Sequence, residues 1–519
     1  MDVHTLTARE LKAHFDRGEL SSVEIVEALY ARGDEVDSRV NAFVHRFRDR
    51  ALEEAKAADE AKDRGEDLGP LHGLPISVKE NIDTRGVPSS LGMKARLGSA
   101  ATADAVTVRV AREAGAIVLG KTNVPQTLLS PLETTNHIWG ATNNPWALTH
   151  GPGGSSGGEG AAIASGQSCL GIGTDIGGSI RFPAGFCGVA GIKPTLDRWS
   201  NVGSRTAIVG QEVIRSQIGP VARTAADVSF LLRALDATKH AAYDPTVAPL
   251  PIGDPAAVDI TKLRIGFYDD DGFFRPASSV RRAVTEARKA LEDAGAELVP
   301  FAPPNAAEVL FLFFEAVSAD GGETLDAALD GEQIIDPLKL VRRGTKLSPR
   351  MRTAAARTAR LFGEERMARL IDAVGAKSVA ELWRITGRRR QYQMDAHAAW
   401  ESQGIDALIC PLHPTPAVPQ GMSQDFTMSF GYAARYNLLN LPAGVVPVTR
   451  VRADETTRAS NHDRLDKRAA AVEAQSRGLP VPVQVVGRSY REDVVLAVMQ
   501  AIEDTARQSA EFPWTPVDP

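Results

Sequence analysis

The stretch SCLGIGTDIGGSIRFPAG (168–185) joins a run of small and apolar residues to a glycine-rich loop. Its first part, SCLGIG (168–173), has the composition of a buried strand and leads directly into Asp175-Ile-Gly-Gly-Ser179. Glycine lets the backbone approach a ligand closely, so successive N–H groups of this loop are free to converge on a developing oxyanion. The stretch therefore predicts a buried strand that ends at a functional loop.

A second glycine-rich stretch, GPGGSSGGEG (151–160), precedes the first one in the chain. It satisfies G-x-S-x-G, the pattern of a nucleophile elbow, but the residues before it, THGPGG (149–154), have the composition of a loop. An elbow needs a strand at that place and a histidine downstream, and nothing singles out a histidine. We expect two tight loops that line one cleft; the alternative is a pair of flexible surface turns.

The base that would activate a serine is either one of three histidines or a lysine. His72, His137 and His150 lie in polar, turn-like surroundings that are typical of structural or solvated residues. Lys79 follows the apolar run 74–78, and burial there would lower its pKa by several units from about 10.4. The sequence pattern by itself favours the alternative, a solvated lysine at the end of a strand.

Short apolar runs alternate with helix-like stretches along most of the chain. LPISV (74–78) and AIVLG (116–120) flank the helical pattern VTVRVAREAG (106–115), and the alternation resumes from KLRIGFYD (263–269) to the C-terminus. This alternation predicts an α/β architecture, a sheet flanked by helices. Residues 115–122 also satisfy the phosphate-loop pattern G-x-x-x-x-G-K-[ST], but their interior is that of a buried strand, so we discount it.

Composition excludes several classes of protein. The net charge of −6 over 519 residues disfavours nucleic acid as the main partner. The N-terminus lacks the apolar core of a signal peptide, and VLFLFF (309–314) is too short to span a membrane. Cys169, Cys187 and Cys410 are widely spaced and form no metal-type pair. They fit a reducing compartment, so we expect a cytoplasmic protein.

The two loops and Lys79 together resemble a known family. Lys79, GGSSGG (153–158) and GTDIGGSIR (173–181), in this order and spacing, are similar to the amidase signature family of Ser–Ser–Lys hydrolases. Further similar segments cover nearly the whole chain: HGLPISVKENID (72–83), VLGKTNVPQ (118–126), FPAGFCGVAGIKPT (182–195) and GLPVPVQVVG (478–487). The resemblance implies one domain over 1–519 with a large twisted mixed sheet and helices on both sides. A helical, arginine-rich insert is expected at 303–403 and an exposed excursion at 452–478.

The resemblance also implies the catalytic residues. Ser179 would be the nucleophile and Lys79 the base, with Ser155, preceded by a cis peptide bond from Gly154, as the bridge between them. Such a relay would activate a serine without histidine, and the resemblance implies that the enzyme uses no metal and no cofactor. The oxyanion hole would consist of the N–H groups of Ile176, Gly177, Gly178 and Ser179. Supporting roles would fall to Ser156, Asp175 and Arg181.

Within the family, the chain looks most like the fatty acid amide hydrolase branch, through segments such as TNVPQTLLS (122–130) and GQEVIRSQIGPVAR (210–223). This implies hydrolysis of amides with an apolar or long acyl chain, with Leu128 and Leu129 lining the acyl channel or lying in the core. Aryl amides, carbamates or esters are alternative substrates of the same site. A glutamine-dependent amidotransferase subunit and a catalytically silent binding scaffold are the alternative functions.

The arginine-rich helices expected over 338–371 allow more than one kind of binding partner. Weak peripheral contact with membranes, a solvated face and a homodimer contact are the three interpretations, and we favour the last two. The arginines concerned are Arg342, Arg343, Arg350, Arg352, Arg357 and Arg360.

Overall fold

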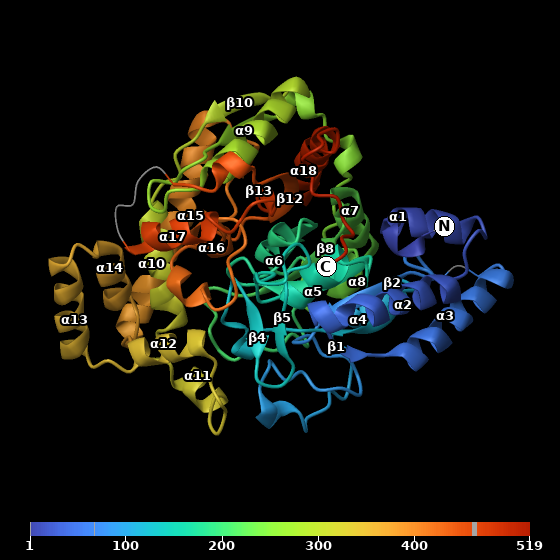
Figure 1. Ribbon diagram of the computed structural model, residues 1–519, viewed down its shortest axis with the longest axis horizontal. Helices are drawn as coiled ribbons and strands as arrows, with labels where there is room; N and C mark the ends of the chain where they lie inside the picture. The colour runs from blue at the N-terminus through green and yellow to red at the C-terminus, as the bar shows by residue number, and fades with distance from the viewer. Residues whose placement is uncertain (1, 67, 459–463) are drawn as a thin grey trace.

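A computed structural model describes residues 2–66, 68–458 and 464–519 (Figure 1). In these residues eleven strands form one mixed sheet, and β4 (Thr134–Asn136) pairs with β5 (Gly140–Thr142) apart from it. The order across the large sheet is β1 (Phe43–Arg46), β3 (Ile117–Thr122), β2 (Pro75–Lys79), β6 (Leu170–Asp175), β8 (Gln217–Ala222), β7 (Ala190–Lys193), β12 (Ala443–Arg450), β13 (Pro480–Gly487), β11 (Ala407–Cys410), β9 (Arg264–Phe267) and β10 (Glu297–Pro300). The predicted α/β fold is confirmed.

Three neighbouring parallel strands position the two loops and the lysine. β2 lies between β3 and β6 and runs parallel to both, with Lys79 opposite Thr122 and Val78 opposite Ile172. Parallel strands end at the same edge of a sheet, so the last residue of β2, Lys79, lies beside the end of β6. The glycine-rich loop that follows Asp175 therefore begins next to Lys79.

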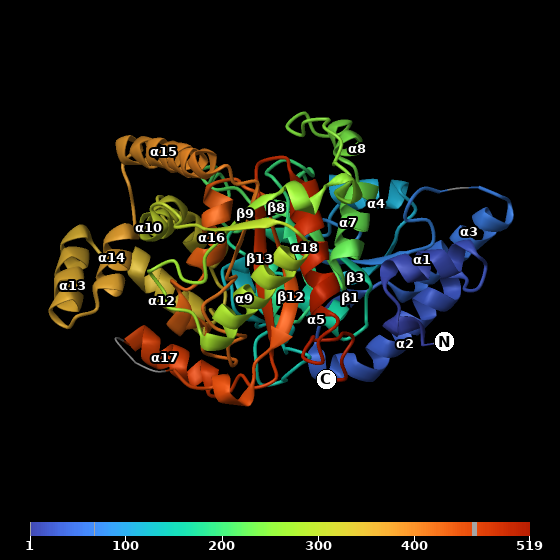
Figure 2. The same ribbon diagram turned by 90° about the horizontal axis from the view of Figure 1, so that it is seen from above.

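Helices cover both faces of the sheet. Gly444 of β12 lies against Met499, and Pro482 of β13 lies against Gly185. Gly444 pairs with Val485 of β13 and so shares its face of the sheet. Pro482 is three residues before Val485, and because side chains alternate along a strand, it faces the other side. Met499 and Gly185 therefore lie on opposite faces of the sheet. Figure 2 shows α9 and α18 lying along β12 and β13 on the first of these faces. The helices outside the central insert are α1 (Ala8–Asp16), α2 (Ser22–Val40), α3 (Arg48–Asp63), α4 (Val106–Glu113), α5 (Gly157–Ala164), α6 (Arg181–Phe186), α7 (Ala225–Ala234), α8 (Ala237–Ala241), α9 (Ser278–Asp293), α16 (Gly431–Leu438), α17 (Arg464–Glu473) and α18 (Glu492–Ala506).

The segment 303–403 is helical and projects to one end of the molecule. α11 to α14 lie at the left end in Figure 1, far from α1 to α3 at the right end. The helices of the segment are α10 (Ala306–Val317), α11 (Glu323–Ala328), α12 (Asp336–Thr345), α13 (Pro349–Leu361), α14 (Glu365–Ala373) and α15 (Val379–Gln403).

The segment 452–478 is less exposed than expected in its described part. α17 buries Leu465, Ala469 and Val472 against the rest of the protein. Residues 459–463 of the segment lie outside the described residues.

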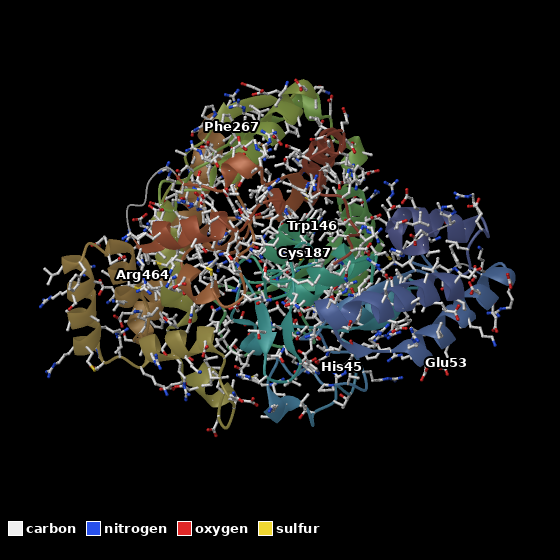
Figure 3. All side chains as sticks on the ribbon, viewed as in Figure 1. His45, Glu53, Trp146, Cys187, Phe267 and Arg464 are labelled. Atoms are coloured by element: carbon white, nitrogen blue, oxygen red, sulfur yellow. The ribbon has the colours of Figure 1, made fainter. Side chains whose placement is uncertain are left out.

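The cysteines belong to the interior of the fold. All three are buried free thiols. Cys187 lies near the centre of the molecule beside Trp146 (Figure 3), whose Nε1 donates to the Cys187 carbonyl at 2.9 Å. Small buried thiols at these places serve packing, because burial raises the pKa of Cys169 to about 12 and keeps it protonated.

Candidate active site

Lys79 is held by three contacts at the end of β2. Its Nζ donates to Ser155 Oγ at 2.7 Å, to Thr174 Oγ1 at 2.8 Å and to the Thr174 carbonyl at 3.3 Å. The side chain has no exposed surface. The expectation of a strand-end lysine is therefore met, but the lysine is buried rather than solvated.

Burial changes the acid–base chemistry of Lys79. Desolvation lowers its pKa to about 7, while the charges of Asp175, Glu159 and Glu80 act in the opposite direction. An amine with a pKa near 7 is largely neutral at slightly alkaline pH and then has a lone pair to accept a proton. Lys79 thus differs from a solvated lysine, which is charged throughout this pH range.

The twin-serine loop lies tightly against its neighbours. The Gly154–Ser155 peptide bond is cis, and a Cβ at Gly154 would overlap the Ser130 carbonyl. Ser156 donates its N–H to the Ser179 carbonyl at 3.1 Å and its hydroxyl to the Thr174 carbonyl at 3.3 Å. Ser155 is directed at Lys79, whereas Ser156 ties its own loop to the loop of Ser179.

A buried ion pair organises the loop of Ser179. Arg181 binds Asp175 through Nε at 2.9 Å and Nη2 at 3.0 Å, and neither side chain is exposed. Burial acts to raise the pKa of Asp175, but the charge and hydrogen bonds of Arg181 hold it well below its ordinary value. The ionised Asp175 accepts the N–H of Ile180 at 3.1 Å, which fixes the backbone around Ser179.

The backbone N–H of Gly178, one of the four expected oxyanion donors, has a partner within its own loop. The Gly178 N–H donates to Asp175 Oδ1 at 2.7 Å, so it points to the carboxylate that supports the loop. Gly178 has φ +119°, and a Cβ there would overlap the Phe182 ring. Only glycine fits this turn. The N–H groups of Ile176, Gly177 and Ser179 are the members of the expected set that remain.

Ser155 and Ser179 lie on the wall of a cleft of about 210 Å³. Ser179 is 6% exposed and Ser155 3%, so both are largely buried where they line this cleft. One part of the lining is apolar and another part is polar, with arginines among its residues. The lining includes Leu128, Leu129, Ile176, Ile208, Ile214, Thr174, Asn81, Gln211, Glu212, Arg205 and Arg215.

Leu128 and Leu129 belong both to this lining and to the core. They lie on the cleft wall and pack against a buried cluster that includes Leu325 of α11 and Leu338 of α12. Leu128 has φ +67°, an unfavourable conformation for a residue with a Cβ. The surrounding packing therefore holds this wall in a strained shape.

The expected alternatives for the base lie elsewhere. None of the described histidines lines the cleft. His72 is buried, contacts the Ala58 carbonyl through Nε2 at 2.9 Å and packs edge-on against Phe15. His150 is also buried, and burial lowers its pKa. These histidines are structural.

Three arginines of the helical insert make contacts within it. Arg342 pairs with Asp326, Arg360 with Asp372, and Arg352 donates to the Val374 carbonyl. Among the described residues, no helix is long and apolar enough to cross a bilayer.

Three residues of the site were missed by sequence reasoning. Thr174 binds Lys79, Asn437 of α16 donates to Asp175 Oδ1 at 2.8 Å, and Glu159 is buried close to the lysine. Thr174 and Glu159 lie inside the two glycine-rich stretches quoted above, so their positions in the sequence weakly indicate that they are near the site. Asn437 comes from a distant part of the chain, and no pattern connects it to this loop.

Comparison with known proteins agrees with this geometry. The model of the Amidase family matches residues 24–496. The chain is 34% identical to fatty-acid amide hydrolase 1 of Sus scrofa, over 84% of this chain and 76% of that protein. It is 32% identical to fatty acid amide hydrolase 1 of Caenorhabditis elegans over 96% and 88%, and 32% identical to acetamidase of Aspergillus oryzae over 96% and 89%.

Solved structures give the same result. A fatty acid amide hydrolase matches with a TM-score of 0.84 and 27% identity, over 97% of this chain and 85% of that one. A 6-aminohexanoate cyclic dimer hydrolase shares the fold, with a TM-score of 0.74 and 24% identity over 97% and 98%. The chain therefore belongs to the amidase signature family and is an amide hydrolase similar to the fatty acid amide hydrolases.

Proposed function

We propose that this amide hydrolase works through Ser179 as nucleophile, Ser155 as bridging residue and Lys79 as base. The observation that carries the proposal is the 2.7 Å contact of Lys79 Nζ with Ser155 Oγ, at a fully buried lysine whose pKa burial lowers to about 7. Ser179 lines the same cleft as Ser155. A neutral amine beside a serine is the arrangement that activates a nucleophile in the absence of histidine.

The proposed reaction moves one proton along this relay. Neutral Lys79 accepts the proton of Ser155 while Ser155 accepts that of Ser179, and Ser179 Oγ attacks the amide carbonyl. As the C–N bond breaks, the proton returns through Ser155 to the leaving amine, which leaves an acyl ester on Ser179. Water then attacks the ester by the same relay, and the carboxylic acid departs. The site needs no metal or cofactor for these steps.

The oxyanion that forms in each half of the reaction is assigned to backbone amides. The N–H groups of Ile176, Gly177 and Ser179 lie in the loop that follows β6 and are proposed to bind it. The Gly178 N–H binds Asp175 instead, and this bond holds the other amides in place.

The cleft supports an amide with an apolar acyl group as substrate. Leu128, Leu129 and Ile176 offer an apolar wall next to Ser179, and arginines lie elsewhere in the lining. Similarity to relatives named fatty acid amide hydrolases supports a long acyl chain as the first candidate for this protein. Similarity to relatives named acetamidases supports a short acyl group as the second candidate. Three buried free thiols support the cytoplasm as the compartment.

Labelling of the nucleophile tests the catalytic assignment. A fluorophosphonate probe should label the wild-type protein at one serine, and Ser179→Ala should lose this labelling completely. Ser402→Ala, a change on the exposed end of α15, serves as the matched control and should label like the wild type. Stoichiometric labelling of Ser179→Ala would refute the assignment.

A substrate panel tests the acyl preference. Long-chain acyl amides, acetamide, an aryl anilide, a carbamate and an ester should be compared by kcat/KM. We expect the highest value for the long-chain amide. A maximum for acetamide would favour the short-chain alternative, and turnover that appears only with added protein partners would favour an amidotransferase subunit.

A further inference from the structure

Glu159 is a fully buried carboxyl that the proposed relay leaves unused. It lies in the first turn of α5, which begins directly after the twin serines. Ser77 Oγ donates to its Oε2 at 2.6 Å and Thr122 Oγ1 to its Oε1 at 2.7 Å. Both oxygens are thus hydrogen-bonded to hydroxyl groups, and within the described residues no lysine or arginine forms an ion pair with them.

The hydrogen-bond partners of Glu159 surround Lys79 in the sheet. Ser77 and Lys79 are two residues apart on β2, so their side chains leave the same face. Thr122 is the residue of β3 directly opposite Lys79. Glu159 therefore lies between α5 and the sheet face that carries the base.

The space for this carboxyl is built into the neighbouring strand. A Cβ at Gly171 of β6 would overlap Glu159 Oε2, so a side chain at that position is excluded. Burying a carboxylate without a paired cation costs several kcal/mol. The cost is avoided if the carboxyl is protonated, and it is reduced if a positive charge lies nearby. Packing alone would be served better by an apolar side chain, which points to an electrostatic role.

Few other charges act on this pair of groups. Burial raises the pKa of Glu159 to about 7, and Ser77, Thr122 and the charge of Lys79 act to lower it. Asp175 and Glu80 also face Lys79, and the charge of Asp175 raises its pKa more than that of Glu159 does; Asp175 is in turn paired with Arg181. Glu80 accepts backbone N–H groups of Ser90 and Leu91. Lys121 on β3 interacts with Glu80 and Asp83.

We propose that Glu159 is a positioning residue that sets the protonation state of Lys79, and thereby the pH range in which the relay works. This rests on the proposed function of Lys79 as the base. An ionised Glu159 stabilises the ammonium that Lys79 becomes when it accepts a proton. A protonated Glu159 leaves Lys79 more readily in the free-base form. The carboxyl and the amine thus titrate as one unit beneath the serines.

The test is the pH dependence of fluorophosphonate labelling of Ser179, from about pH 5 to about pH 9. Glu159→Gln keeps the shape of the side chain and removes its charge. The midpoint of the acid limb should move to lower pH by about one unit, because the ammonium loses a neighbouring negative charge. Ser77→Ala should move it in the same direction by less, because the carboxylate loses a hydrogen bond that favours its charged form.

Glu503→Gln is the matched control. Glu503 of α18 is also buried with its pKa raised to about 7, but it binds the Ala225 N–H and Arg507, away from Lys79. This variant should keep the wild-type midpoint.

The outcomes separate this inference from the proposed function. The role of Glu159 would be overturned if Glu159→Gln and Ser77→Ala both kept the wild-type midpoint and changed the labelling rate by the same factor at every pH. Ser77→Ala alone decides the question if Glu159→Gln does not fold. A wild-type protein without an acid limb, or a Lys79→Ala variant that keeps it, would instead overturn Lys79 as the base.

Discussion

At the scale of single residues, the proposed hydrolysis depends on how burial lowers the pKa of the Lys79 amine. Lys79 has no exposed surface, and its pKa is lowered to about 7 mainly by desolvation. Its three contacts all go to oxygen atoms, at Ser155 and Thr174. A lysine in this state differs from a solvated one in having a lone pair available near neutral pH.

Lys79→Ala should lower kcat/KM for amides by about 100-fold to 10,000-fold, the usual contribution of a general base. In the wild type, the rate should rise with pH through about 7, because the ammonium form of Lys79 cannot accept a proton. The variant should lack this rise, and a pH profile of turnover measures both effects. Unchanged turnover at neutral pH would remove Lys79 from the mechanism.

At the scale of elements, a strand and the loop that follows it place the nucleophile. β6 ends at Asp175, whose ion pair with Arg181 at the start of α6 closes the loop between them. Gly178 makes the sharp turn inside this loop against the Phe182 ring. The position of Ser179 is thus determined by backbone geometry rather than by contacts of its own side chain.

Gly178→Ala should displace this loop, because its Cβ would overlap Phe182 and φ of +119° is unfavourable for alanine. Displacing a nucleophile by about 1 Å costs roughly 100-fold in rate, so fluorophosphonate labelling should slow by that order. Gly331→Ala has a positive φ but no atom close to its Cβ and is the control. Equal labelling rates in the two variants would contradict the steric argument.

The apolar cleft wall on the loop after β3 permits a test of acyl binding. Leu129→Glu places a charge where an apolar chain is proposed to bind, so kcat/KM for a long-chain amide should fall at least about tenfold relative to acetamide. Leu361→Glu, on a residue of α13 that is 87% exposed, should leave this ratio unchanged. An unchanged ratio in Leu129→Glu would move the acyl chain to another wall.

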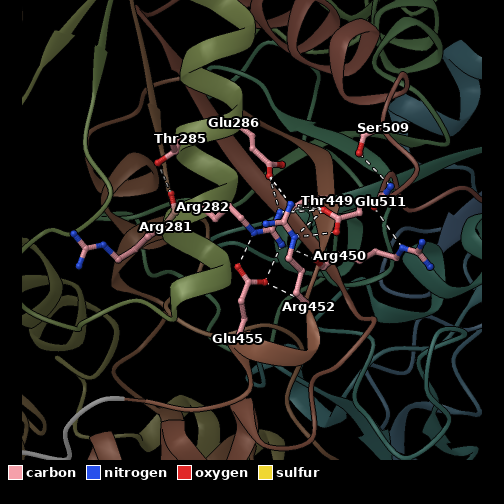
Figure 4. Close-up of polar contacts among 10 residues, drawn as sticks. All are labelled: Arg281, Arg282, Thr285, Glu286, Thr449, Arg450, Arg452, Glu455, Ser509 and Glu511. Carbon is pink, nitrogen blue, oxygen red and sulfur yellow. Dashed lines mark hydrogen bonds and ion pairs between the residues drawn. The ribbon is translucent and has the colours of Figure 1, made fainter.

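At the scale of the whole molecule, charged residues join distant parts of the chain around the end of β12 (Figure 4). Arg282 of α9 donates to Glu455 at 2.6 Å and to Glu286 at 2.6 Å. Arg452, just after β12, binds Glu511 in the C-terminal segment at 2.8 Å. The network links α9, the end of β12 and the segment after α18.

Arg282→Ala should lower the free energy of unfolding by about 2–3 kcal/mol, because it leaves the partly buried carboxylate of Glu455 without its guanidinium partner. Arg281→Ala, the next residue of α9, loses only an exposed pair with Asp269 and should cost less than about 1 kcal/mol. Chemical denaturation measures the difference. Similar losses in both variants would show that the network adds no stability.

The sequence by itself determined the elements and the family. Apolar runs such as 74–78 and 168–173 predicted buried strands, because apolar side chains favour the interior of a sheet, and GGSSGG with GTDIGGSIR indicated the amidase signature. Only the tertiary structure decided that Lys79 is fully buried, that the Gly178 N–H binds Asp175, and that Glu159 and Asn437 lie close to Lys79 and Asp175. These properties depend on desolvation and on contacts between residues far apart in the chain, which no local pattern encodes.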